Sequence, residues 1–312
     1  MRFQSYFVIK VFTGMLNYKC KRPLKVNNIN VLTPNKKTFK KRSDTMLKNK
    51  VFVVTGGGNG IGREVVLHLL DRGSRVAAID ISEKGLLETK KLSNKSDDLL
   101  KTYPLDITNL LKVQETYQDI LKDFKAIDGL IHVAGIIQPF VKVIDLEYEA
   151  INKVINVNLY GTLYLNKTFL PALLEQKEAY LVNVSSMGGF LPVPGQSLYG
   201  ASKAAVKLLT EGLYGELKDT NVNVTCVFPG AIKTDIAKNS NVSIKIDTSE
   251  KTESTYKMLE ADKAAELIVK AMLKKKLYSY VGKDSRIMNK LYRLSPRRAT
   301  NMIIRKMSHL LQ

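Results

Sequence analysis

The sequence predicts an α/β fold, a doubly wound parallel β-sheet with helices on both faces, in a single domain with a basic helical tail. Three observations lead to this prediction. Short apolar runs of strand length alternate with longer segments of helical period. The runs are apolar without alternation, which is typical of strands buried on both faces. A cluster of glycines lies between the first run and the first helix. Such a sheet gathers the carboxyl ends of its strands at one edge, where ligands bind.

The first half of the body holds four predicted strands and three helices. The first helix has apolar residues at Ile61, Val65, Val66 and Leu69, which fall on one helical face. The predicted strands are Val51–Thr55, Arg75–Ile79, Thr102–Leu105 and Leu130–Ala134, and the predicted helices are Gly60–Arg72, Glu83–Lys91 and Leu110–Phe124.

The second half continues the alternation. A long helical segment runs from Asp145 to Leu174 and is expected to break near Gly161. The polar segment 231–258 follows Pro229 and is interpreted as a lid over the substrate. The remaining predicted strands are Tyr180–Val184, Val222–Phe228 and Tyr278–Val281, and the remaining helices are Tyr199–Leu217 and Ala261–Leu273.

Charge divides the chain into three parts. The net charge is +20, but the first 43 residues hold eleven Lys and Arg with no acid. Residues 270–312 hold twelve, opposed only by Asp284, so the middle is close to neutral. We therefore expect a basic extension over 1–46, a folded body over 47–283 and a basic tail over 284–312. A nucleic-acid protein would more often carry its charge on the folded body, so no nucleic-acid partner is expected.

The N-terminal extension leaves three interpretations open: a disordered segment, an organellar targeting segment, or a translation start placed too early, with Met46 as the alternative start. No apolar run is long enough to cross a membrane. Of the two cysteines, Cys226 lies in an apolar run and is read as a buried thiol, and Cys20 lies in the extension. This low cysteine usage favours a reducing compartment, and we expect a cytoplasmic protein.

The tail predicts two amphipathic helices. Ile287 and Leu291 share one apolar face before Pro296, and Met302 with Ile303 mark a second face after it. Lys and Arg fill the opposite faces. Such helices can lie on an anionic membrane surface, or they can dock on the protein itself or on a partner subunit.

The glycine loop Thr55–Gly62 joins the first strand to the first helix. Glycines allow a pyrophosphate to approach the backbone, and the helix start offers unpaired N–H groups. Asp80 ends the second strand, where a carboxylate can bind both ribose hydroxyls of NAD and repel the 2′-phosphate of NADP. The next residue is Ile81 and the loop carries Asn59, so no cation compensates Asp80, and NAD is favoured over NADP.

A second motif combines Tyr199 with Lys203, four residues apart on one helix. A phenol titrates near pH ~10, so it works as a base at neutral pH only if nearby positive charge lowers its pKa. Ser185 and Ser186 end the preceding strand, where a hydroxyl can bind a carbonyl oxygen.

With these motifs the chain resembles the classical short-chain dehydrogenase/reductase (SDR) family, from about residue 48 to about 282. The resemblance implies a Rossmann-like fold and hydride transfer between NAD(P) and an alcohol or a ketone or aldehyde. It implies that Tyr199 is the acid/base, Ser186 binds the reacting oxygen, Lys203 holds the nicotinamide ribose and lowers the tyrosine pKa, and Asn158 bends its helix and holds a water. The expected alternative is a non-catalytic dinucleotide-binding protein anchored by its tail.

The resemblance also extends the cofactor site beyond the glycine loop and implies a homodimer or homotetramer formed through the helices at 157–174 and 200–217. No metal site is expected. The predicted cofactor-binding residues are Thr55, Gly56, Gly58, Asn59, Gly60, Ile61, Gly62, Asp80, Asp106, Ile107, Ala134, Gly135, Tyr199, Lys203, Pro229, Gly230, Ile232 and Thr234.

One departure from the family stands at the end of the fourth strand. The family has Asn-Ala-Gly there, whereas this chain has His132 followed by Val133, which puts local stability in doubt. A histidine at a strand end is more often structural than catalytic.

The walls of the substrate site are expected from three segments: residues 136–140, residues 187–194 and the loop after Thr234. Phe140, Phe190 and Leu191 are apolar, so a lipophilic alcohol or ketone is favoured.

Overall fold

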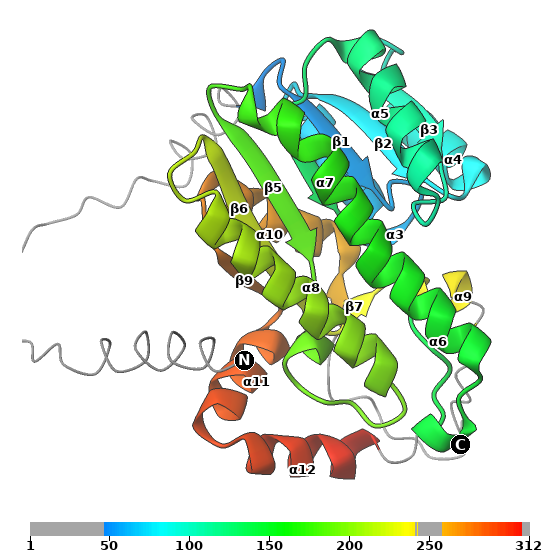
Figure 1. Ribbon diagram of the computed structural model, residues 1–312, viewed down its shortest axis with the longest axis vertical. Helices are drawn as coiled ribbons and strands as arrows, with labels where there is room; N and C mark the ends of the chain where they lie inside the picture. Colours follow the sequence, from blue (N-terminus) through cyan, green and yellow to red (C-terminus); the bar gives the residue numbers. More distant parts are fainter. Residues whose placement is uncertain (1–46, 241, 243–257, 308–312) are drawn as a thin grey trace, which may run out of the picture. The chain divides into compact units, whose positions relative to one another are not determined.

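The computed structural model describes residues 47–240, residue 242 and residues 258–307. Their centre is a seven-stranded sheet in the order β3-β2-β1-β4-β5-β6-β9, with every neighbouring pair parallel (Figure 1). A separate two-stranded sheet joins β7 to β8. The strands are β1 (Val51–Thr55), β2 (Arg75–Asp80), β3 (Leu100–Pro104), β4 (Gly129–His132), β5 (Ala179–Val184), β6 (Val222–Pro229), β7 (Ile232–Lys233), β8 (Leu259–Glu260) and β9 (Tyr278–Val281).

Helices cover both faces of the large sheet (Figure 1). The α-helices are α3 (Gly60–Leu70), α4 (Glu83–Ser93), α5 (Leu110–Phe124), α6 (Tyr148–Ile155), α7 (Gly161–Leu174), α8 (Ser197–Glu216), α9 (Ile236–Asn239), α10 (Ala261–Leu273), α11 (Lys283–Leu294) and α12 (Pro296–Met307). Shorter turns are the 3₁₀ segments η2 (Val143–Asp145) and η4 (Met187–Gly189) and the π-helix η3 (Asn156–Tyr160).

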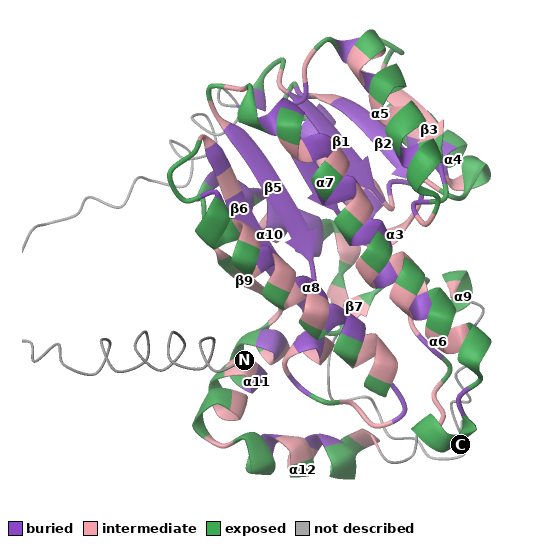
Figure 2. Ribbon diagram, viewed as in Figure 1, coloured by how far each residue is buried: buried purple, intermediate pink, exposed green. Residues whose placement is uncertain are grey.

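The core has two layers because successive strand residues face opposite ways. In β1, Phe52 and Val54 pack with α3, α4 and α10, whereas Val51 and Val53 pack with α5 and α7. The inner strands β1, β2, β4, β5 and β6 are buried almost throughout, as Figure 2 shows, whereas most residues of the edge strands β3 and β9 are half-buried or exposed. The predicted fold class is therefore confirmed.

Element boundaries agree closely where the apolar pattern is clear. The strand β1 and the helices α5 and α10 have the predicted bounds. The long helical segment is interrupted, as expected, and α7 begins at Gly161. The interruption is a π-helix that contains Asn158, and such an extra residue in a helical turn is frequent at functional sites.

The tail forms the two predicted helices, α11 and α12, and part of their apolar surface packs on the body of the protein. Met288, Ala299 and Ile303 form one buried cluster with Leu191 of the loop after η4. Ile287, Leu294 and Ile304 remain 62%, 85% and 44% exposed, so contact of the tail with a partner subunit or a membrane surface stays a prediction. None of the described helices is long and apolar enough to cross a membrane.

Three segments lie outside the described residues: 1–46, most of the predicted lid (241 and 243–257) and the last residues, 308–312. The expectations for the N-terminal extension and for the greater part of the lid fall there.

Candidate active site

The predicted catalytic residues meet at the carboxyl edge of the sheet. Ser186 follows β5 and begins η4, Tyr199 and Lys203 lie in the first turns of α8, and Asn158 lies in the π-helix. These elements come together because η4 packs against α8 and the π-helix packs against the same helix.

Tyr199 lies next to Ser186, whose hydroxyl lowers the pKa of the phenol, and this is the central contact of the predicted site. Gly188 lies beside both, since a Cβ there would be 3.4 Å from the Tyr199 ring and 3.5 Å from Ser186 Oγ. Ser186 Oγ also accepts a hydrogen bond from Gly188 N at 3.0 Å. The two side chains can therefore reach one substrate oxygen together.

The protonation of Tyr199 differs from the expectation. Burial raises the pKa of the phenol, and the hydrogen bond from Ser186 opposes this only in part. In the chain without a bound ligand, removal from water therefore outweighs the effect of Ser186, and the lowering of the phenol pKa by Lys203 beside a bound cofactor stays a prediction.

Lys203 is 3% exposed and its Nζ donates to Val184 O at 3.1 Å. Burial lowers the pKa of this amine to about 8, so it remains mostly protonated at pH 7. A Cβ on Gly135 would lie 2.8 Å from Lys203 Nζ and 3.1 Å from Asn158 Oδ1. The amine therefore lies between the ends of β4 and β5, at the ligand edge.

Asn158 holds the loop after β4. Its Nδ2 donates to Ile136 O at 2.9 Å and to Ser202 Oγ at 3.0 Å, and its Oδ1 accepts from Ile136 N at 2.9 Å. Both amide hydrogens are thus used by the protein, and Oδ1 keeps one lone pair. The expected bend of its helix is present as the π-helix, and the expected water contact stays a prediction.

His132 is structural. Thr55 Oγ1 accepts from the N–H groups of Val133 and Ala134, at 3.2 and 3.3 Å, so its hydroxyl donates to His132 Nδ1 at 2.7 Å. His132 Nε2 then donates to Thr162 Oγ1 at 2.8 Å, and Thr162 donates onward to Asn158 O.

These hydrogen bonds connect β1, β4 and α7. They stabilise the end of β4, where Val133 in place of the family's asparagine had put local stability in doubt. Burial, helped by the charge of Lys203, lowers the pKa of His132 to about 3. The imidazole is therefore neutral at pH 7 and is already engaged on both nitrogens.

The glycine loop fits a dinucleotide. Gly56 has a φ of +72°, which a residue with a side chain rarely adopts, and it turns the chain from β1 into α3. Asn59 caps α3 by accepting from Gly60 N at 2.6 Å, so the helix start faces the sheet edge. Such a helix start binds phosphate through free N–H groups.

Asp80 lies against this loop. Its Oδ2 accepts from Gly58 N at 2.9 Å and its Oδ1 from Ser82 N at 2.8 Å, and a Cβ on Gly58 would lie 2.9 Å from the Asp80 carboxyl carbon. Arg63 lies near the same loop, but its guanidinium is paired with Glu88 at 2.7 Å. Among the described residues, no ion pair neutralises Asp80 at this position, and its contact with a ribose stays a prediction.

Comparison with known proteins identifies the family. The sequence profile of the short chain dehydrogenases matches residues 50–245. An uncharacterized oxidoreductase of Staphylococcus aureus (strain USA300) is 35% identical over 198 residues, which are 63% of this chain and 84% of that protein. A second relative is SadH of Mycobacterium tuberculosis (strain ATCC 25618 / H37Rv), which is named as an inferred oxidoreductase. It is 32% identical over 252 residues, which are 79% of this chain and 91% of SadH.

The chain belongs to the short-chain dehydrogenase family. It is an NAD(P)-dependent oxidoreductase, as the sequence predicted, and a purely dinucleotide-binding role is not favoured.

Solved structures share the fold. A short-chain dehydrogenase/reductase from Burkholderia phymatum, solved with NAD, has a TM-score of 0.70 at 24% identity and covers 80% of this chain and 95% of its own. Levodione reductase has a TM-score of 0.69 at 25% identity, covering 77% and 98%. A Burkholderia cenocepacia (strain J2315) member solved with NADP has a TM-score of 0.69 at 24% identity, covering 83% and 98%.

The outer parts of the predicted dehydrogenase cofactor site show local contacts. Asp106 Oδ1 accepts from Thr108 N and Thr108 Oγ1, so this exposed carboxylate shapes the turn after β3. Ile107 is buried against Gly161. Thr234 lies across the crevice, where a Cβ on Gly60 would be 3.2 Å from its methyl group. The glycine loop and the segment after β6 thus form two sides of one site, and the contact of Asp106 with adenine stays a prediction.

The sequence did not single out Asp284, which reaches this site from the tail. Its Oδ2 accepts from Ala231 N at 2.7 Å, directly after Gly230, and Ser285 Oγ donates to Phe228 O at 2.8 Å. The sequence feature that could have identified Asp284 is that it is the single acid among the basic residues of the tail.

Two of the predicted substrate-wall residues are placed elsewhere. Leu191 is fully buried in the cluster with α11 and α12. Phe190 packs edge-on against Phe228 and Tyr280, with ring centroids 5.7 and 5.9 Å away. Both residues attach the loop to the tail, so this part of the predicted substrate wall is wrong.

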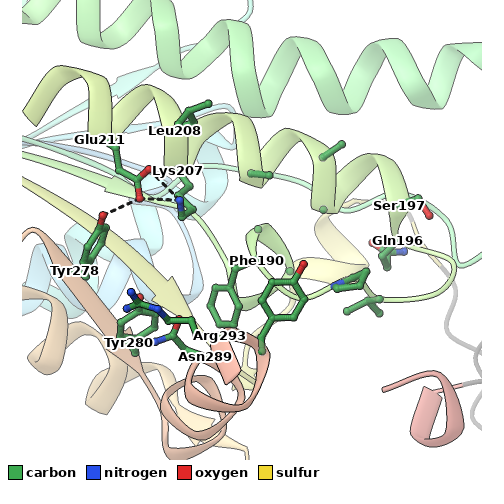
Figure 3. A pocket seen from close by; sticks show the side chains of 18 residues that line it. Phe190, Gln196, Ser197, Lys207, Leu208, Glu211, Tyr278, Tyr280, Asn289 and Arg293 are labelled. Carbon is green, nitrogen blue, oxygen red and sulfur yellow. Dashed lines mark hydrogen bonds and ion pairs between the residues drawn. The ribbon is translucent and has the colours of Figure 1, made fainter. Parts of the chain in front are cut away.

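A cavity of about 760 Å³ lies on a different face of α8 from Tyr199 and Lys203. Figure 3 shows Glu211 with Lys207 and Tyr278 on one side, and Phe190 with Arg293 on the other. The cavity is lined by neither the glycine loop nor Ser186, so it is not the crevice in which a nicotinamide and a substrate would meet. Among the described residues, no cluster of His, Cys, Asp and Glu is placed to hold a metal ion.

Proposed function

We propose that this dehydrogenase uses NAD to interconvert a lipophilic secondary alcohol and its ketone, or the corresponding alcohol and aldehyde, with Tyr199 as the acid/base. The observation that carries the proposal is that Tyr199 and Ser186 meet beside Gly188 at the carboxyl edge of the sheet, with Lys203 one helical turn further on.

The chemistry divides between the cofactor and this pair of hydroxyls. The nicotinamide ring, when bound, accepts or donates the hydride. Ser186 would donate a hydrogen bond to the substrate oxygen and fix its place. Tyr199 would take the proton of an alcohol during oxidation and return it to the oxygen during reduction.

Lys203 is the residue that makes proton exchange by Tyr199 practicable. To bring a phenol pKa from above its usual value near 10 down to 7 requires at least about 4 kcal/mol. A unit positive charge about 5 Å away supplies about 3 kcal/mol at an effective dielectric constant of about 20. The ammonium of Lys203 and a positively charged nicotinamide together are sufficient, and the raised pKa of free Tyr199 means that ligand binding precedes activation.

The preference for NAD over NADP is supported by Asp80. Its carboxylate can accept both ribose hydroxyls and would repel a 2′-phosphate, while Arg63 is already neutralised by Glu88. The lipophilic substrate is supported by half-buried apolar side chains that follow β4 and β5 at the same edge, namely Ile136, Ile137, Phe140 and Met187.

The test is an initial-rate assay with NADH and NADPH against ketones and aldehydes of increasing alkyl or aryl size. We expect consumption of reduced nicotinamide with NADH, with kcat/KM rising by about threefold or more for each added methylene that is buried. Equal rates with polar sugars would reject the lipophilic substrate, and a preference for NADPH would reject the role of Asp80.

A homodimer or homotetramer through α7 and α8 is part of the same proposal. Large apolar side chains remain exposed on these helices: Leu163 is 39% exposed, Leu208 68% and Tyr214 41%. Light scattering after size exclusion should report an oligomer that Leu208→Glu dissociates, and a monomeric wild type would reject the interface. A cytoplasmic location also stays a prediction, supported by the buried free thiol of Cys226.

A further inference from the structure

Gln138, in the loop after β4, makes hydrogen bonds to the start of the helix that carries Tyr199. The residue is fully buried. Its Oε1 accepts from Leu198 N at 2.7 Å and from Tyr199 N at 2.9 Å, and its Nε2 donates to Gly195 O at 3.0 Å. Gln196 Nε2 donates in return to Gln138 O at 2.7 Å.

These contacts replace a cap that α8 does not supply itself. The first N–H groups of any helix have no partner within the helix. Within the described part of the chain, the N-cap residue Gln196 makes no side-chain cap of α8. The Oε1 of Gln138 therefore caps the helix from another element, on the two N–H groups that precede and include Tyr199.

The backbone of Tyr199 is held on both sides. Its N–H donates to Gln138, and its carbonyl accepts from Ser202 Oγ at 2.7 Å. Ser202 in turn accepts from Asn158, which clamps Ile136, two residues before Gln138. The loop after β4, the π-helix and the first turn of α8 thus close one ring of hydrogen bonds around the tyrosine.

We propose that Gln138 is a positioning residue for Tyr199: it holds the first turn of α8 so that the phenol stays in register with Ser186. The expected effect on turnover rests on the proposed function. The expected effect on the first turn of α8 rests on the hydrogen-bond geometry alone. Gln138 acts through the backbone and does not touch the reacting oxygen. A site held loosely by about 1 Å loses much of its rate, so a backbone clamp of this kind is expected to affect turnover more than binding.

The first experiment replaces the amide by a side chain of similar length, Gln138→Met. We expect kcat to fall by about tenfold to hundredfold, because the first turn of α8 loses its acceptor. The dissociation constant of NADH should stay within about twofold, because the hydrogen bonds of Gln138 go to Gly195, Gln196 and the start of α8 and none reaches the glycine loop. The matched control is Gln118→Met on the exposed side of α5. An unchanged kcat in Gln138→Met would overturn the proposal.

The conservative variant Gln138→Glu distinguishes positioning from general loss of packing. A carboxylate can still accept from both N–H groups, and the helix start favours its negative charge. Its second oxygen faces the Gly195 carbonyl, so the donation there is kept only when the carboxyl is protonated. We expect kcat to recover by at least about fivefold relative to Gln138→Met. Equal losses in both variants, with both folded by circular dichroism, would overturn the assigned role of Oε1.

Amide hydrogen exchange tests the clamp without any substrate. The N–H groups of Leu198 and Tyr199 should be protected in the wild type and should exchange at least about tenfold faster in Gln138→Met, whereas those at the end of α8 should be unchanged. Unaltered protection would reject the clamp. If the clamp is seen but no alcohol or ketone turns over in the wild type, the proposed function fails while the local inference stands.

Discussion

The nucleotide half and the catalytic half of the site lie at one sheet edge but are built differently. On the nucleotide side, Asp80 is half-buried, and its carboxylate accepts from the backbone N–H groups of Gly58 and Ser82. On the catalytic side, Asn158 and Lys203 are buried, and their side chains bond to Ile136 and to Val184. The first arrangement leaves polar groups free for a ligand, whereas the second uses nearly all of them to fix geometry. We therefore expect changes on the nucleotide side to alter affinity and changes on the catalytic side to alter turnover or stability.

The largest effect is expected from Tyr199→Phe, which keeps the ring and removes the proton-exchanging hydroxyl. We expect kcat to fall by about a thousandfold or more, since general acid–base catalysis contributes about 10² to 10⁴ and the bond to Ser186 is also lost. The dissociation constant of NADH, measured by fluorescence titration, should change by less than about twofold.

Tyr148→Phe on α6 is the control, because Tyr148 is 82% exposed. Residual turnover above a tenth of the wild-type value in Tyr199→Phe would mean that another group exchanges the proton.

The next effect is expected on stability, from His132→Leu. The change leaves Thr55 and Thr162 without their shared partner in the core, and we expect a loss of about 2–4 kcal/mol in the free energy of unfolding by urea at pH 7.5.

The same residue predicts a dependence on pH. The pKa of His132 is lowered to about 3 in the folded chain, against an ordinary value of 6.5, so the unfolded chain binds a proton that the folded chain refuses. Its contribution is therefore complete above pH 6.5 and is lost progressively as the pH falls toward 3, by up to about 1.4 kcal/mol per pH unit. Urea titrations from pH 7.5 to 4.5 should show a shallower decline in His132→Leu, and parallel declines would contradict the buried neutral imidazole.

A smaller effect, on cofactor choice, is expected from Asp80→Asn. The amide keeps an acceptor for Gly58 N but loses the charge that binds ribose hydroxyls, so kcat/KM for NAD should fall by about tenfold to hundredfold. The value for NADP should rise, because repulsion of the 2′-phosphate is removed. Asp97→Asn, which affects a surface pair with Lys90, should change neither value. An unaltered ratio of kcat/KM for NAD to kcat/KM for NADP would contradict the assigned role of Asp80 in cofactor choice.

The smallest effect is expected where the tail meets the site. Asp284→Ala removes the acceptor of Ala231 N, and we expect a loss of about 1 kcal/mol, seen as a fall of about 2–4 °C in Tm. Glu216→Ala, at the exposed end of α8, serves as the control. Identical melting of the two variants would show that the Asp284 carboxylate does not help to hold the tail.

The sequence predicted what depends on neighbours in the chain. The bounds of α5 and α10 follow from clear helical periods, and the loop from Gly56 to Gly62 follows from glycines between a strand and a helix. The catalytic residues were found because their spacing matches a known family, and the structure brings Tyr199, Ser186 and Lys203 to one edge.

What the sequence missed depends on contacts between distant segments. Gln138 and Tyr199 are far apart in the chain, and a lone glutamine in a loop carries no signal of the helix that it caps. Phe190 and Leu191 look like pocket residues until the tail docks on them. The raised pKa of Tyr199 in the chain without a ligand could not be predicted either, because burial is a property of the packed structure.

The carboxylate of Asp284 has a thermodynamic consequence. It joins the last helices to the turn at Gly230, on which a nicotinamide is expected to rest. Any ligand that orders this turn must favour attachment of the tail. By reciprocity, attachment of the tail must raise the affinity for that ligand. Saturating NAD should then slow proteolytic removal of the C-terminal helices, and a chain trimmed before Asp284 should hold the dinucleotide less tightly.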